Sequence, residues 1–202
     1  MNSATCDFQI AARTFEMLGA SAEGDALQRM VSRYEDMLPS TLPLKQGRVL
    51  PNVREILDTL DGRSDVRSYL LTGNTRRGAR AKLTHYDLLK YFSDGAFAED
   101  QGLRATIATR AIELARRSGE IDLQHVYVIG DTPHDVEAAN AIGVKTIAVA
   151  TGGYSVEELS AHHPWRAFEE LPPPAEFLNL IGLGRPAFAP DGASARQASP
   201  KA

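Results

Sequence analysis

The sequence has almost no cysteine, no long apolar run and no excess of positive charge. Cys6 is the single cysteine among 202 residues, which excludes an internal disulfide and favours a reducing compartment. No apolar stretch reaches the length of a membrane span, and the first residues have neither the basic region nor the apolar core of a secretion signal. From these absences we expect a cytoplasmic protein.

Charge and glycine spacing exclude further classes of protein. The chain carries a net charge of −4, which gives no electrostatic reason to expect nucleic acid or an anionic membrane as a partner. Gly78 is followed by Ala79-Arg80 where a nucleotide P-loop has Lys-Ser or Lys-Thr, and no Gly-x-Gly-x-x-Gly follows a predicted strand. The P-loop and dinucleotide-binding interpretations therefore both fail.

The stretch Val126–Asp135 organises the rest of the chain. Its first four residues, Val-Tyr-Val-Ile, are typical of a strand buried on both faces. A glycine and Asp131 end this strand, and Thr132-Pro133 can open a helix as its N-cap and first helical residue. We therefore expect Asp131 and Asp135 at the carboxyl end of a parallel strand, the edge of an α/β sheet where ligands bind.

Two interpretations of these carboxylates stay open. Asp135 falls at the third helical position, where a capping box with Thr132 would explain it without any further role. Asp131 directly follows the buried strand, where a carboxylate is costly unless it is paired, solvated or bound to a metal. Mg²⁺ takes oxygen ligands and retains several waters, so paired carboxylates suit it. We interpret Asp131 as a metal ligand, and Asp135 can serve both as a cap and as support for the metal.

Apolar periodicity divides the chain into three parts. Residues 1–43 hold two helical stripes before a proline-rich boundary, and we expect a helical appendage there. Residues 44–182 alternate strands and helices, which predicts a parallel sheet with helices on both faces. Residues 183–202 are rich in Pro, Ala, Ser and Gly, and we expect them to be disordered. The expected strands are 66–71, 96–97, 126–129 and 146–149; the expected helices are 8–18, 27–38, 53–60, a helix from the turn at 72–75 to 92, 104–117, 132–142 and 156–161.

The loop at Leu71–Asn74 is a candidate anion site. It joins a strand to a helix and combines the hydroxyl of Thr72 with the successive backbone N–H groups of Gly73 and Asn74. Free N–H groups and the helix dipole favour phosphate at such a helix N-terminus. The alternative, in which Asn74 or Thr75 is only an ordinary N-cap, stays open.

Arg104 stands near the start of its predicted helix, where the helix dipole disfavours a cation. A bound anion or a carboxylate partner would offset that cost. Solvation of the side chain and fraying of the helix end would offset it as well, so the position alone does not decide the role of Arg104.

Taken together, these motifs resemble the haloacid dehalogenase superfamily. The motifs are the strand followed by Thr72-Gly73-Asn74, a later cation at a helix start, and the strand followed by Gly-Asp-Thr-Pro-His-Asp at 130–135. More narrowly, residues 5–181 resemble phosphoglycolate-phosphatase-type members that carry a helical cap. The resemblance implies a three-layer, Rossmann-like α/β core at 44–182 and a partial helical cap at 1–43.

The resemblance also implies a role for each motif. Thr72, Gly73 and Asn74 would bind the phosphate of a small phosphorylated metabolite, and Asp131 and Asp135 would hold Mg²⁺ or its waters. The third motif of the family is usually a lysine, and because none occurs in the matching segment, Arg104 is the expected substitute. The implied reaction is Mg²⁺-dependent hydrolysis of a phosphate monoester through an aspartyl-phosphate intermediate.

One family motif has no counterpart in this sequence. Members carry an Asp-x-Asp nucleophile motif on a strand that lies between the strands ending at Thr72 and Asp131, and the sequence contains no Asp-x-Asp. We therefore expect this central strand to be missing, and the printed chain to be a shortened, inactive version of a phosphatase. An inactive paralogue is the alternative history. A noncatalytic module that binds a phosphorylated ligand or a partner is the alternative function.

Overall fold

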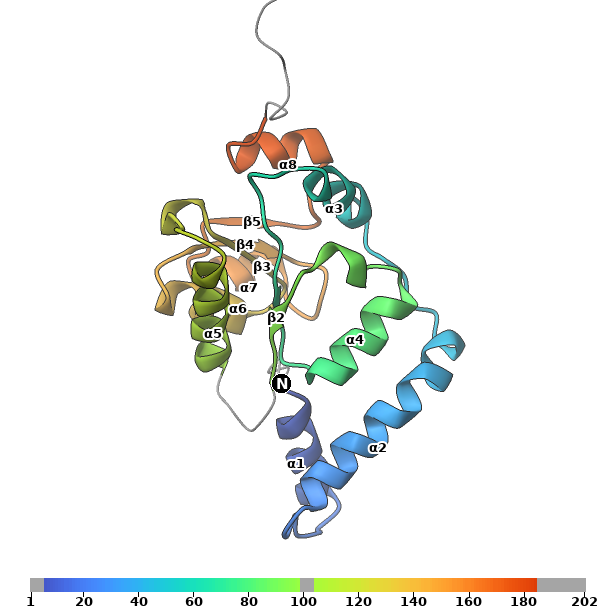
Figure 1. Ribbon diagram of the computed structural model, residues 1–202. Coiled ribbons are helices and arrows are strands. Elements are labelled where there is room, and N and C mark those ends of the chain that lie inside the picture. The colour runs from blue at the N-terminus through green and yellow to red at the C-terminus, as the bar shows by residue number, and fades with distance from the viewer. Residues whose placement is uncertain (1–5, 99–103, 185–202) are drawn as a thin grey trace, which may run out of the picture.

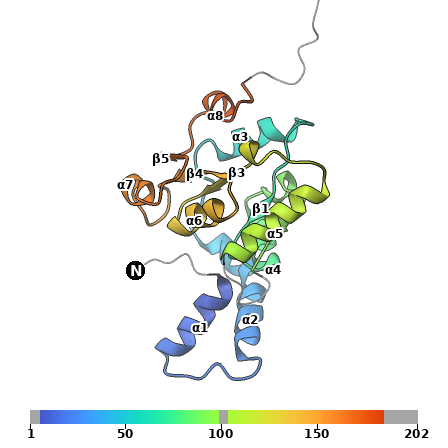
Figure 2. The same ribbon diagram turned by 90° about the vertical axis from the view of Figure 1, so that its left-hand side faces the viewer.

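A computed structural model describes residues 6–98 and 104–184 of the chain. A pair of helices projects from one end of an α/β body in both views (Figures 1 and 2). The disorder predicted for the tail falls, from residue 185 onward, on residues outside the described ones. The division of the chain at residues 43 and 182 stays a prediction.

The projecting pair is formed by α1 (Asp7–Met17) and α2 (Ala26–Thr41), and the 3₁₀ turn η1 (Leu42–Leu44) follows it. The expectation that the second helix stops before Pro39 is wrong, because Pro39 lies inside the last turn of α2. The hydroxyls of Ser40 and Thr41 each donate to the carbonyl of Met37 at 2.9 Å. These side-chain bonds support the last turn in spite of the N–H group that the proline lacks.

A short parallel pair of strands forms the first sheet. The pair consists of β1 (Leu70–Leu71) and β2 (Gly95–Ala96), which are connected by α4 (Arg76–His85) and the 3₁₀ turn η2 (Leu89–Tyr91). Both the strand predicted at 66–71 and the helix predicted to reach 92 are therefore too long. The helix ends early because Asp87 adopts a φ of +54°, which a right-handed helix cannot contain.

The second sheet has three parallel strands in the order β3-β4-β5. They are β3 (Tyr127–Gly130), β4 (Lys145–Val149) and β5 (Arg166–Phe168), with α6 (Pro133–Ala141) and α7 (Val156–Ser160) between them. The 3₁₀ turn η3 (Leu123–His125) precedes β3. The sequence pattern does not predict β5, because its three residues include an exposed arginine and have no apolar alternation.

Helices cover both faces of this second sheet, which confirms the predicted three-layer α/β architecture. On one face, Ile147 and Val149 pack with Ile56 of α3 (Val53–Asp61) and Phe177 of α8 (Pro174–Leu180). On the other face, Ala148 packs between α6 and α7. The remaining helix, α5 (Arg104–Arg117), packs beside α6 (Figure 2).

Within residues 6–98 and 104–184, the five strands form two separate sheets. Leu71 of β1 nevertheless packs against the same apolar cluster as Val128 of β3, so the two sheets lie close to one another. Ile129 is 46% exposed, which corrects the expectation that its strand is buried on both faces. Its neighbour Ile147 on β4 is fully buried, whereas Ile129 stands on the edge strand, where no further strand adjoins β3 in the described ranges. The missing central strand itself stays a prediction.

No helix in the described part of the chain combines the length and the apolar character that crossing a membrane requires.

Candidate active site

The loop after β1 is folded around the hydroxyl of Thr72. Asn74 donates to Thr72 Oγ1 twice, from its backbone N at 3.1 Å and from its side-chain Nδ2 at 2.7 Å. The loop is fixed to its neighbour β2 because Thr72 N donates to the carbonyl of Ala96 and Ala98 N donates to the carbonyl of Asn74. Thr72, Gly73 and Asn74 thus share one turn at the carboxyl end of β1.

Thr75, the next residue, is the N-cap of α4. Its Oγ1 accepts a hydrogen bond from Gly78 N at 3.1 Å. This contact decides which residue caps the helix, a point that the sequence left open between Asn74 and Thr75. The side chains of Thr72 and Asn74 are therefore not needed for capping.

Both helices of the projecting pair contact Thr75 through a carboxylate. Asp7 Oδ2 accepts from Thr75 N at 2.8 Å, and Asp7 N donates to the carbonyl of Gly73 at 2.9 Å. Glu35 Oε1 accepts from Thr75 Oγ1, and Glu35 Oε2 lies 3.5 Å from Arg77 Nη1. We call Asp7, Glu35 and Thr75 the Thr75 clamp. No local sequence pattern predicts this clamp, because its contacts join residues 68 and 40 positions apart.

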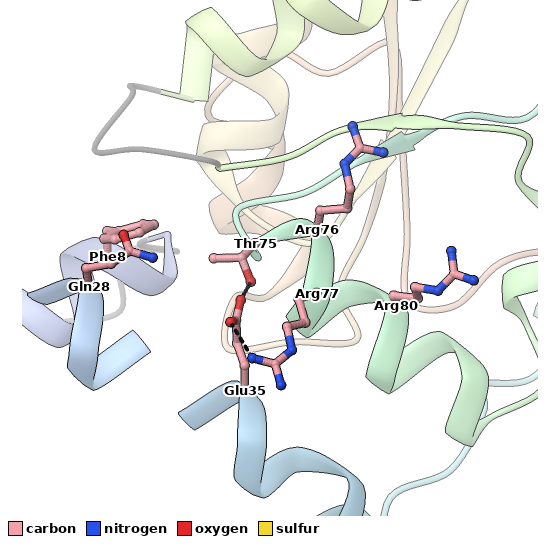
Figure 3. Close-up of a pocket in the computed structure, with 7 residues that line it drawn as sticks. All are labelled: Phe8, Gln28, Glu35, Thr75, Arg76, Arg77 and Arg80. Atoms are coloured by element: carbon pink, nitrogen blue, oxygen red, sulfur yellow. Dashed lines mark hydrogen bonds and ion pairs between the residues drawn. The ribbon is translucent and has the colours of Figure 1, made fainter. Parts of the chain in front are cut away.

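A cavity of about 310 Å³ lies beside this clamp, between the helix pair and the first turns of α4 (Figure 3). Glu35 points toward Thr75 and Arg77 in the cavity. Arg76 and Arg80 also line it, but of the three arginines drawn Arg77 alone extends toward Glu35, and Arg76 pairs with Asp94 at 3.0 Å. Among its lining residues the cavity has three arginines and one glutamate, a balance that favours an anionic over a cationic ligand.

The loop after β3 holds the two predicted metal ligands. Thr132 N and Thr132 Oγ1 donate to Asp135 Oδ2 at 3.2 and 2.7 Å, and Pro133 is the first residue of α6. The predicted capping box is therefore confirmed, and Asp135 is only 2% exposed. Asp131 is half-buried directly after β3.

Two glycines leave room for these carboxylates. A Cβ atom on Gly130 would lie 2.5 Å from Asp135 Oδ2, and one on Gly152 would lie 2.2 Å from Asp131 Oδ2. Cβ atoms do not approach other atoms that closely, so these carboxylate positions require glycine. Gly152 follows β4, and Asp131 is therefore packed against the loop of the neighbouring strand.

The chemistry of this donor set fits Mg²⁺. The ion binds to one or two carboxylates and keeps several waters. Across residues 6–98 and 104–184, no group of three or more His, Cys, Asp or Glu side chains could hold a metal. A magnesium site here would therefore consist of Asp131, supported by Asp135, and water. This assignment stays a prediction.

The predicted cation Arg104 begins α5, but its side chain lies outside the described part of the structure. A different cation contacts the candidate phosphate loop. Lys82 of α4 donates from Nζ to Asn74 Oδ1, and its ammonium lies 5.6 Å from the centroid of the Tyr34 ring. Lys82 was not predicted, because it lies on α4, outside the segment that matches the family's third motif.

Both candidate loops lie at the carboxyl ends of parallel strands in an α/β fold. Loops with polar side chains at the carboxyl ends of parallel strands are the ligand sites of open α/β proteins. The family described as HAD-hydrolase-like matches residues 97–172. A 5'-nucleotidase of Pseudomonas aeruginosa is 32% identical over 137 residues, which make up 66% of this chain and 59% of that protein. The match thus spans less than two thirds of this curated relative.

Solved structures share the fold. A predicted phosphoglycolate phosphatase from Haemophilus somnus superposes with a TM-score of 0.64 at 16% identity, covering 89% of this chain and 76% of that chain. A HAD hydrolase of family IA, variant 3, from Entamoeba histolytica superposes with a TM-score of 0.63 at 14% identity, covering 89% of this chain and 91% of that chain. Family match and fold both agree with the resemblance that the motifs predicted: residues 97–172 match the HAD-hydrolase-like family, and the chain shares the fold of solved haloacid dehalogenase-like structures.

Proposed function

We propose that this chain supplies the phosphate-binding and Mg²⁺-binding parts of a phosphatase that acts on the monoester of a small phosphorylated metabolite. The observation that carries the proposal is the pairing of two loops. The Thr72 loop ends β1 at a helix N-terminus, and the acidic loop ends β3, while Leu71 and Val128 of these strands belong to one apolar cluster. Anion donors and metal-binding carboxylates at the ends of two strands that share one apolar cluster suit phosphoryl chemistry.

Each predicted residue has a role in this proposal. Thr72 would hold the phosphate through its hydroxyl and Gly73 through its backbone N–H, and Asn74 would support the site through its two hydrogen bonds to Thr72 Oγ1. Asp131 would bind Mg²⁺ together with water, with Asp135 in support, and the bound ion would offset negative charge on the phosphoryl oxygens. Arg104 would add a positive charge at the start of α5. In the net reaction, water replaces the ester oxygen on phosphorus, which yields an alcohol and inorganic phosphate.

The size and charge of the cavity support a small anionic substrate. Its volume of about 310 Å³ falls within the range of small-molecule pockets. Three arginines line it next to Thr75, which directly follows the phosphate loop. The names of the similar proteins, a 5'-nucleotidase and a phosphoglycolate phosphatase, also denote small phosphorylated substrates.

We further propose that residues 1–202 bind phosphate without turning over phosphate esters. In the family reaction a carboxylate attacks phosphorus. Asp7 is a carboxylate that contacts the phosphate loop, but its Oδ2 is held by the N–H group of Thr75. A hydrogen bond of this kind stabilises the anion and makes it a weaker nucleophile.

The test uses the purified 1–202 chain with Mg²⁺. We expect no turnover of p-nitrophenyl phosphate or phosphoglycolate, and we expect calorimetry to detect binding of inorganic phosphate that Thr72→Val removes. Turnover that disappears in both Asp131→Asn and Asp7→Asn would refute inactivity and identify Asp7 as the attacking group. Phosphate binding that is absent, or equal in the wild type and Thr72→Val, would refute the phosphate site.

The coding DNA upstream of Met1 separates a shortened phosphatase from a noncatalytic binding module. A phosphatase requires an in-frame apolar strand that ends in Asp-x-Asp, and a protein extended by that strand should hydrolyse p-nitrophenyl phosphate. An in-frame stop codon close before Met1, with no such strand, would favour the binding module.

A further inference from the structure

We propose that Lys82 is a positioning residue for the anion site: its ammonium fixes the side-chain amide of Asn74, and this amide turns the hydroxyl of Thr72 into a donor toward the ligand. The inference rests on the proposed phosphate site at Thr72. It assigns to α4 a function that neither the motifs nor the family match indicate.

The contact with Lys82 fixes the orientation of the Asn74 amide. An ammonium group has three donors and no acceptor, so the amide atom that Lys82 Nζ contacts must be the oxygen, Oδ1. The amide nitrogen then lies on the opposite side. It points to Thr72, and Nδ2 donates to Thr72 Oγ1 at 2.7 Å.

The orientation of the Asn74 amide in turn directs the proton of the Thr72 hydroxyl. A hydroxyl oxygen has two acceptor lone pairs and one donor proton. Asn74 occupies both lone pairs, one from its backbone N at 3.1 Å and one from Nδ2. The proton is therefore directed away from Asn74, where it can donate to an anion oxygen. A hydroxyl held in this way favours an anionic ligand over a cation.

Lys82 is needed because the amide of Asn74 has two possible orientations. Without a donor on Oδ1, the amide can rotate by 180° and present Oδ1 to Thr72, which would then donate its proton to Asn74. The ligand would then no longer receive a hydrogen bond from Thr72, although every other atom of the loop stayed in place. Lys82 is suited to prevent this rotation because it is half-buried and lies beside the ring of Tyr34 from the helix pair.

The experiment measures binding of inorganic phosphate to the full 1–202 chain by calorimetry. Lys82→Met keeps the unbranched side chain without its donor, and we expect it to weaken binding about tenfold, the worth of one hydrogen bond to a charged group. Lys82→Arg retains a donor and should recover most of the affinity. The exposed Lys45 provides the control, since Lys45→Met removes the same charge away from the loop and should leave the affinity unchanged.

A double-mutant cycle separates positioning from direct attraction between the ammonium and phosphate. In an Asn74→Ala background there is no amide to orient, so Lys82→Met should cause no further loss of affinity. An equal loss in both backgrounds would mean that Lys82 acts through its charge alone, and the proposal would be wrong. Equal affinities of the wild type and Lys82→Met would also overturn it.

A second measurement keeps this inference separate from the proposed function. The NMR resonances of the Asn74 side-chain NH₂ group report its hydrogen bond to Thr72 without any ligand present. We expect them to shift in Lys82→Met and to remain near the wild-type position in Lys82→Arg. Absent phosphate binding in the wild type would refute the phosphate site, whereas unchanged resonances in Lys82→Met would refute the role of Lys82.

Discussion

If Asp131 is a ligand of the proposed metal site, replacing it should weaken Mg²⁺ binding. Asp131→Asn keeps the shape of the side chain but removes its charge, so the affinity for Mg²⁺ should fall by at least the ~10-fold that even outer-shell changes cost. Calorimetric titration of the 1–202 chain with Mg²⁺ measures this loss. Asp61→Asn, at the exposed end of α3, is the matched control. A titration of Asp131→Asn that matches the wild type would remove Asp131 from the site.

A substitution at Gly152 tests the position of the Asp131 carboxylate independently. In Gly152→Ala the new Cβ would lie 2.2 Å from Asp131 Oδ2, so the carboxylate must move. We expect weaker Mg²⁺ binding in this variant. Gly62→Ala places its Cβ in open space and should bind Mg²⁺ like the wild type. Two equal Mg²⁺ titrations would show that the position of Asp131 does not matter for the metal.

Single residues were predictable where their contacts are local. The capping box of Thr132 and Asp135 follows from a spacing of three residues, and the structure has it. The contacts of Asp7 and Glu35 with Thr75 depend on how the helix pair docks, which no local pattern encodes. Lys82 lies only eight positions from Asn74, but a lysine on an amphipathic helix normally faces solvent, so its position alone does not signal a contact.

The N-cap of α4, Thr75, also contacts the helix pair. Thr75→Val removes the cap bond to Gly78 N and the donor to Glu35, and should lower the free energy of unfolding by about 1–3 kcal/mol. Urea denaturation followed by circular dichroism measures this change. Thr84→Val makes the same exchange at an exposed position of α4 and should change stability by less than about 0.5 kcal/mol. Equal effects of the two substitutions would contradict the clamp.

Elements with strong local signals were predicted well, and elements that depend on tertiary contacts were not. The helix predicted at 104–117 matches α5 at both ends, because periodicity and a following glycine define it. The strand ending at Leu71 is shorter than predicted because only two of its residues pair with β2. α8 was missed, and its apolar residues belong to a cluster that includes Ile147 of β4, far away in the sequence.

Acid should destabilise the whole molecule through carboxylates such as Asp94. The N–H group of Gly95 and, next, the guanidinium of Arg76 lower the pKa of Asp94. A lowered pKa in the folded state stabilises the fold fully above the unfolded pKa of about 3.9, and this contribution is lost as the pH falls toward the folded value. Melting temperatures between pH 6 and 3 should therefore fall, and Asp94→Asn should show a smaller fall. An identical pH dependence in the variant would exclude Asp94 as a contributor.

The Thr75 clamp has a consequence for the molecule as a whole that is thermodynamic rather than structural. Thr75 holds the helix pair through Asp7 and Glu35, and it directly follows the loop proposed to bind phosphate. Docking of the helix pair and occupancy of the loop are then two linked equilibria. If docking of the helix pair raises the phosphate affinity by some factor, bound phosphate must raise the docking constant of the helix pair by the same factor. The amide protons of α1 and α2 would then exchange more slowly with solvent when phosphate is present, even in a chain that never hydrolyses an ester.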